Sequence, residues 1–270
     1  MTIALARPAM PSRLWQDAPV MTGLTVLMAL AAIPILLAMG LDPRQFQAES
    51  IWLKPLKFHV ALVIFTTTLA FYARWLPAGL SDRRGWRVYL GVVTFAILAE
   101  LLWIGGAAAL STASHFNVSS PVWAVLYPLM GLSAVTLTSA ALAFGVSIAR
   151  NPATGLDPAL KLSLVTGLCL TFLLTVITAG TMSSMPGHHI GLPVTGARLP
   201  LFGWSREVGD LRVAHFLATH ALHAIPLAGL AAARLLAPAP ARAAVIAASL
   251  AYAALVLATF GQALSGMPLI

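Results

Sequence analysis

Seven long blocks of apolar residues constrain this chain more than any other feature of its sequence. A helix needs about 20 residues to cross the hydrocarbon core of a bilayer, and every block reaches that length. The blocks are Val20–Gly40, Pro55–Leu76, Trp86–Leu110, Pro121–Ala149, Pro158–Ser183, Leu211–Leu236 and Ala241–Gly266. Of the 270 residues, 59% are hydrophobic and only 9% are charged. The sequence predicts an all-α, polytopic transmembrane bundle of about seven helices, with residues 1–270 as one helical domain.

The basic residues predict how the bundle is oriented. Ten of the sixteen Lys and Arg lie in the N-terminal segment or in the loops after the second, fourth and sixth blocks. By the positive-inside rule, the N-terminus is cytoplasmic and the C-terminus is external. The first block exceeds a usual signal-peptide core and is interpreted as a retained helix. Short basic loops beside anionic lipid explain the net charge of +8, so we expect a lipid bilayer and no nucleic acid as partner.

Histidines gather toward the predicted external side. His215, His220 and His223 share one block, where they span an arc of about 140° on one helical face. Asp210 is a predicted N-cap for this helix, and Pro226 predicts a kink just beneath His223. Ionisable side chains are costly within a bilayer, so a one-sided cluster of them indicates a functional site.

Glu100 is the only acidic residue deep inside a predicted helix. Its depth in the third helix is close to that of His220, so we expect Glu100 to share a cavity with His220 and His223. A carboxylate there can bind a metal, orient an imidazole or relay protons, and Glu100 is the candidate catalytic residue. The alternative is a protonated carboxyl that bonds to a neighbouring helix.

Four basic residues lie on the less positive, external side: Lys54, Lys57, Arg206 and Arg212. They are candidates for binding anionic groups of a cofactor, such as haem propionates, or of a substrate. The alternative is that they are interfacial anchors whose charged ends reach water.

The long external loop at residues 184–210 is rich in Gly and Pro and begins with His188 and His189. A loop of this length in a compact bundle is often functional. Together with Met182 and Met185, these histidines could bind copper, since thioether and imidazole suit that metal. Methionines at a helix end are otherwise packing or lipid-facing residues.

Three segments carry a family resemblance: Trp52–Phe58, His115–Asn117 and Gly209–Ala221. Their sequences WLKPLKF, HFN and GDLRVAHFLATHA resemble a family of uncharacterised bacterial integral membrane proteins. The resemblance spans most of the chain and implies the bacterial inner membrane, but it brings no activity or ligand.

Two cofactors fit the histidines, and haem b is slightly preferred over a bare metal. Haem b needs two facing imidazoles, which His215 or His220 could supply opposite His59 or a loop histidine. A bare metal, copper, iron or zinc, needs convergent ligands, available from His188, His189, His215, His220 and His223, with Glu100 nearby.

The sequence therefore predicts a redox-type membrane protein, leaning to an oxidoreductase, that holds a histidine-coordinated cofactor near its external face. A quinone or another small molecule would be its substrate, and a membrane protein could be its partner. The alternative is a non-catalytic protein: a proton-linked transporter, a pH sensor or an accessory subunit of a larger complex.

Overall fold

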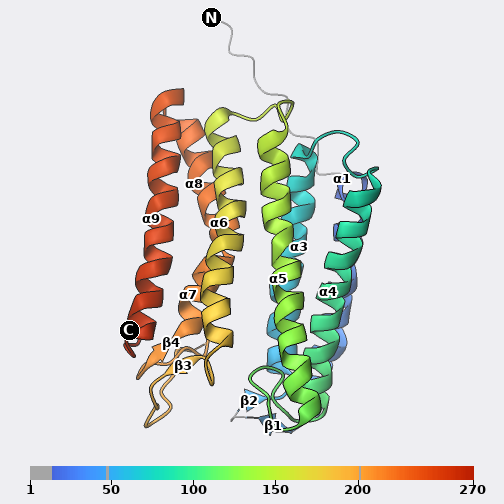
Figure 1. Cartoon of the computed structure of the whole chain (residues 1–270), viewed down its shortest axis with the longest axis vertical. Helices are drawn as coiled ribbons and strands as arrows, with labels where there is room; N and C mark the ends of the chain where they lie inside the picture. The colour runs from blue at the N-terminus through green and yellow to red at the C-terminus, as the bar shows by residue number, and fades with distance from the viewer. Residues whose placement is uncertain (1–13, 47–48, 201) are drawn as a thin grey trace, which may run out of the picture.

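The computed structural model describes residues 14–46, 49–200 and 202–270. This part of the chain is a bundle of long helices with two small sheets at one end (Figure 1). In chain order the elements are α1 Leu14–Asp17, α2 Pro19–Leu41, β1 Gln45–Phe46, β2 Glu49–Ser50, α3 Leu53–Tyr72, the 3-10 turn η1 Ala73–Trp75, α4 Arg84–Ala109, α5 Pro121–Arg150, α6 Pro158–Ser183, β3 His189–Ile190, β4 Gly209–Asp210, α7 Leu211–Thr219, α8 Ala221–Leu235 and α9 Pro238–Leu264. Arg7 and Arg13, which contributed to the predicted orientation, lie outside the described residues.

Six helices are long and apolar enough to cross a membrane, namely α2, α3 with η1, α4, α5, α6 and α9. The pair α7 and α8 meets the same criterion jointly, with a bend of 50° between the two helices. The described residues thus contain up to seven spans, which confirms the predicted all-α polytopic bundle. In Figure 1, α1 lies near the upper end and α9 ends near the lower end, as an odd number of crossings requires. The chain is a multi-pass membrane protein.

The helices form two groups that meet along α5 and α6. Helices α2 to α5 pack in sequence order, while α6 packs against α7, α8 and α9. The ribbons of α5 and α6 are close at the upper end and diverge toward the lower end (Figure 1). The largest apolar core joins both groups and includes Leu69, Phe144, Leu168 and Leu222, each at most 1% exposed.

The seventh span is broken at His220. The sequence predicted a kink beneath His223 at Pro226, but Pro226 lies inside α8 and the chain bends six residues earlier. At the break, the Thr219 hydroxyl and the Nδ1–H of His220 both donate to the Phe216 carbonyl oxygen, at 2.9 and 2.7 Å. The Phe216 carbonyl oxygen thus accepts from two side chains in place of a helical backbone N–H. This competition between side-chain and backbone donors accounts for the position of the break.

Side chains from three other helices form hydrogen bonds with backbone groups at the break and at Leu222, whose carbonyl Pro226 leaves without its helical partner. The Leu222 N–H donates to Thr171 Oγ1 at 2.7 Å, and the Tyr252 hydroxyl donates to the Leu217 carbonyl oxygen at 2.7 Å. The Leu222 carbonyl loses its helical partner to Pro226, as predicted, and accepts from the Tyr72 hydroxyl at 2.9 Å. Because lipid offers no hydrogen bonds, these contacts are what allows a broken helix inside the bundle.

The 184–210 loop folds back on itself over the lower end of the bundle. Strands β3 and β4 pair antiparallel with His189 opposite Asp210. Nearer its tip, the Glu207 carboxylate accepts from the N–H groups of Val194, Thr195 and Ala197 at 2.5, 2.9 and 2.6 Å. One carboxylate thus closes the turn of the loop.

We expect Glu207→Gln to loosen this turn. The pKa of Glu207 is lowered to about 2, first by the Thr195 hydroxyl and then by backbone N–H groups. A lowered pKa means that the stabilisation is fully present above the ordinary value of 4.5 and is lost as the pH falls toward 2. Hydrogen exchange of the Val194, Thr195 and Ala197 amides at pH 7 should therefore be faster in the variant. The control Asp82→Asn, an exposed carboxylate in the loop before α4, should leave it unchanged, and equal rates in the Glu207 variant and the wild type would contradict the assignment.

Candidate functional site

The structure brings three potential metal ligands together where the 184–210 loop returns to the bundle. One ligand atom each from His188, His189 and Asp210 lies within 4.8 Å of the other two. The pairing of β3 with β4 sets this arrangement, because it places His189 opposite Asp210. The Leu211 N–H also donates to the His188 carbonyl oxygen at 2.9 Å, which fixes the start of β3 against the start of α7. We name His188, His189 and Asp210 the loop cluster.

Asp210 was predicted as a helix N-cap but not as a possible ligand. The N-cap role is confirmed, since its Oδ1 accepts from the Arg212 N–H at 3.1 Å. Its side chain is fully buried and lies 3.5 Å from His189 Nε2. The contact joins residues 21 positions apart, and no spacing rule connects a loop histidine to an N-cap at that separation. Only the strand pairing reveals it.

Electrostatics keep two members of the loop cluster, Asp210 and His188, in the protonation states that bind metals. Burial disfavours an ionised Asp210, but the hydrogen bonds and charge of Arg212, with His189 3.5 Å away, outweigh it and hold the pKa of Asp210 below its usual range. Burial, followed by the charge of Arg212, lowers the pKa of His188 to about 3. An ionised carboxylate and a neutral imidazole are the forms that coordinate divalent ions. Both are present at neutral pH without a metal.

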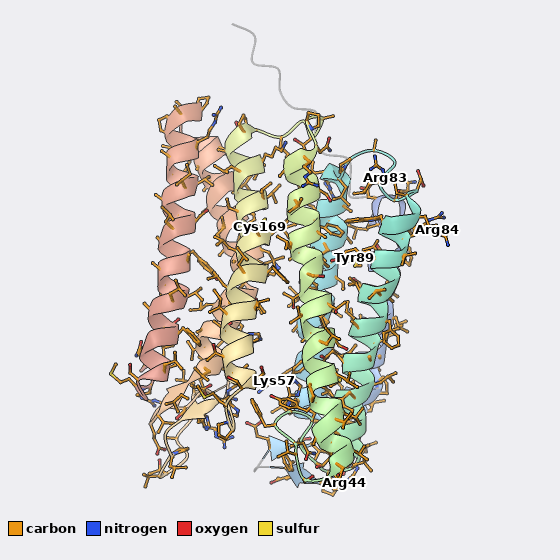
Figure 2. All side chains as sticks on the ribbon, in the orientation of Figure 1. Arg44, Lys57, Arg83, Arg84, Tyr89 and Cys169 are labelled. Atoms are coloured by element: carbon orange, nitrogen blue, oxygen red, sulfur yellow. The ribbon has the colours of Figure 1, made fainter. Side chains whose placement is uncertain are left out.

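The four basic residues predicted to bind an anionic group differ in their surroundings. Arg212 donates to both oxygens of Asp210 and to the Gly203 carbonyl oxygen, so a protein carboxylate already neutralises it. The Arg206 side chain is exposed. Lys57 belongs to α3, and Figure 2 shows it toward the lower end of the bundle. A cofactor role for these residues stays a prediction.

Lys54 lies at the centre of a second polar group. Its Nζ is 3.2 Å from His115 Nδ1, and it interacts electrostatically with Glu100 and Arg212. Burial, then the charges of Lys54 and His215, lower the pKa of His115 to about 3. Lys54 therefore contacts the loop before α5 and lies within electrostatic range of α4 and the start of α7, which the sequence could not show.

Glu100 is 3% exposed, and neither carboxylate oxygen has a hydrogen-bond partner among the described residues. This excludes the alternative in which a protonated carboxyl bonds to a described neighbouring helix. His220 contacts Phe216 and His223 bonds to Thr68, and neither forms a hydrogen bond with Glu100 among the described residues. The predicted cavity shared by Glu100 and these histidines stays a prediction.

The helix break presents two imidazoles with free nitrogens. His220 donates its Nδ1–H to the Phe216 carbonyl oxygen, which leaves Nε2 as an acceptor. The Thr68 hydroxyl donates its only proton to the Ile64 carbonyl oxygen. Its oxygen therefore accepts a hydrogen bond from Nε2–H of His223 at 2.9 Å. The His223 Nδ1 lone pair then has no partner, and the two rings are 5.5 Å apart.

Aromatic side chains connect the loop to the helix break. Phe202 stacks on Trp204 at 4.4 Å between ring centroids, and Trp204 meets the edge of Phe216 at 5.4 Å. Phe216 in turn lies 4.1 Å from the His220 ring. His215, one residue before Phe216, has a buried Nδ1 with no partner. The 184–210 loop thus covers the α7 face that carries the histidines.

No hydrogen bond or ring contact among the described residues joins His59 to His215 or His220, so their pairing stays a prediction. His59 lines a pocket formed by α2, α3 and α4, on the other side of α3 from Lys54. At about 100° per residue, His59 is about 140° around the helix from Lys54. Met182 and Met185, the possible copper ligands, pack against an apolar cluster that includes Leu211 and Phe260.

Comparison of this chain with protein families, with curated proteins and with solved structures found no match.

Proposed function

We propose that this chain is an oxidoreductase of the bacterial inner membrane that binds one divalent transition metal ion at the external end of its bundle. The observation that carries the proposal is the loop cluster, with His188, His189 and Asp210 offering ligand atoms within 4.8 Å of one another. Two imidazoles and one carboxylate, with further positions open, are the ligand set of non-haem iron(II) oxidases and oxygenases. Iron is therefore the proposed ion, and zinc, which accepts similar ligands, is the alternative that the experiment must distinguish.

The surroundings of the loop cluster support metal binding. Arg212 orients the Asp210 carboxylate through two side-chain hydrogen bonds, as outer residues commonly orient metal ligands. Arg212 also competes for the charge of Asp210, which lowers the affinity for a cation. Because these two effects oppose each other, we expect the site to bind the ion with moderate affinity and to lose it to chelators.

The polar group around Lys54 supplies the remaining chemistry in this proposal. Lys54 interacts electrostatically with His188 of the loop cluster and with Glu100. A bound ion would activate a ligand at its open positions, and Lys54 and His115 would transfer protons to or from it. Glu100, buried without a hydrogen-bond partner, would receive or release the proton at the inner end.

Haem b has less support than a bare metal. A haem iron needs two imidazole nitrogens on opposite sides of one plane, and His59 faces α2 and α4 instead of α7. Copper also has less support, because Met182 and Met185 pack against an apolar cluster.

A specific observation favours a second, non-catalytic function. Glu100, His215 and His223 carry buried atoms without hydrogen-bond partners within spans, as a proton-linked transporter or sensor would need. This candidate requires no metal, so metal content separates the two.

We expect the protein, purified without chelator and reloaded with iron(II) under anaerobic conditions, to retain about one iron per chain. His189→Ala should lower the retained iron at least about tenfold, because losing a ligand costs no less than losing an outer-shell partner. His59→Ala, a histidine outside the loop cluster, should retain wild-type iron. Elemental analysis of each gel-filtered sample provides the measurement.

Three results would contradict the proposal. Stoichiometric zinc in place of iron would remove the oxidoreductase function. Full iron in His189→Ala but loss in His220→Ala would move the site to the helix break. Wild-type protein without any metal would favour the proton-linked function.

A further inference from the structure

A pocket on the opposite side of α3 has no place in the proposed metal site. Helices α2 and α4 each pack on α3 and leave a pocket of about 560 Å³ between them. Its walls include Leu27 and Leu102, which are 52% and 77% exposed on membrane spans. The pocket is therefore an apolar groove that opens toward lipid.

One polar residue lines this groove, and it is buried. His59 is 6% exposed, and its Nδ1 lies 2.9 Å from the Pro55 carbonyl oxygen. A carbonyl can only accept, so Nδ1 carries the proton and the neutral ring presents Nε2 as an acceptor. Nε2 is on the ring edge away from Pro55, and no other hydrogen bond joins His59 to the described residues. An apolar groove with one unpartnered acceptor is suited to bind an apolar molecule that carries an O–H donor.

The depth of His59 restricts what that molecule can be. His59 is six residues into α3, which places it about 9 Å from the end of the helix. A charged phospholipid headgroup stays at the interface because moving a charge into hydrocarbon is costly. A weakly polar hydroquinone ring can enter to that depth.

The groove wall also suits a flat ring. Gly105 and Gly106 of α4 line the pocket, and a Cβ added at either would meet nothing within 4 Å. The other lining residues, which include Leu27 and Ile35, continue along α2 as an apolar surface.

We propose that this groove binds a quinol. The quinol O–H donates to Nε2 of His59, the ring lies along Gly105 and Gly106, and the isoprenoid tail follows the apolar wall of α2. The proposal does not depend on the metal site, because no residue of the loop cluster lines the groove.

Titration of decylubiquinol into the purified protein in detergent, with protein-free micelles subtracted, tests the groove. Gly106→Leu places a side chain in the binding space and should weaken binding at least about tenfold. Gly91→Leu is the matched control, since it adds the same side chain to the same helix, also with open space around it, but outside the groove. It should leave the Kd unchanged.

A second pair of measurements tests the hydrogen bond. His59→Ala should weaken decylubiquinol binding about two- to tenfold, the range for one net hydrogen bond. Wild-type protein should also prefer decylubiquinol to decylubiquinone, which has no O–H, and His59→Ala should abolish that preference. This comparison is made within one protein, so it does not depend on equal folding of the variants.

Several outcomes would overturn the proposal. The wild type could fail to bind decylubiquinol saturably, or the wild type and Gly106→Leu could bind it with the same Kd. The preference for decylubiquinol over decylubiquinone could also persist in His59→Ala. Equally tight binding of diacylglycerol would show that the groove takes lipid alcohols in general. A failure of metal binding would leave all these expectations unchanged.

Discussion

Replacing Asp210 with alanine should lower the free energy of unfolding by about 3 kcal/mol, the low end of the range for removing one partner of a buried ion pair. The low end applies because the Arg212 side chain is 32% exposed and can regain some water. The same change removes the N-cap of α7 and the acceptor for the Ser205 N–H at 3.0 Å. Thermal or denaturant unfolding in detergent provides the measurement.

The chain contains a matched control for this prediction. Asp42 and Arg44 repeat the two-residue spacing of Asp210 and Arg212 and form the same kind of pair at 2.7 Å. Their side chains are 20% and 48% exposed, and exposed pairs contribute little to stability. Asp42→Ala should therefore cost much less than Asp210→Ala. Equal losses would show that burial does not set the strength of the Asp210 pair.

We expect Gly229→Ala to destabilise the protein by about 1–3 kcal/mol, as overpacking usually does. A Cβ at Gly229 would overlap the side chain of Ser163 where α8 crosses α6. Alanine favours a helix over glycine by up to about 1 kcal/mol, so a net loss would show that the contact between helices dominates. The unfolding midpoint in detergent is the measurement.

Ser163→Gly in the Gly229→Ala background should restore most of this stability. With the serine side chain removed, the nearest remaining atom to the added Cβ is the Ala159 carbonyl oxygen at 3.6 Å, an ordinary contact. The pair is therefore expected to be strongly non-additive. Simple addition of the two single losses would contradict the proposed overlap.

The spans could be predicted from the sequence because each depends on local composition. Hydropathy located the segments, and the N-cap at Asp210 and the free carbonyl at Leu222 followed from rules that act within one helical turn. These two local predictions are confirmed.

The tertiary parts of the site could not be read in the same way. Helical periodicity places His59 and Lys54 on different faces of α3, but it does not say which helices those faces meet. The partnership of His189 with Asp210 depends on strand pairing across a loop. The bend at His220 depends on which donors reach the Phe216 carbonyl, and the sequence pointed to Pro226 instead.

The broken seventh span also has a consequence for biosynthesis. Thr171, which accepts from the Leu222 N–H, belongs to α6 and is synthesised before the break, whereas Tyr252, which donates to the Leu217 carbonyl, belongs to α9 and is synthesised after it. Leu217 therefore reaches the membrane before its tyrosine partner exists. Insertion of α9 completes the hydrogen bonding of a helix made earlier, so the region around His220 reaches its final geometry only after the next span has entered the bilayer.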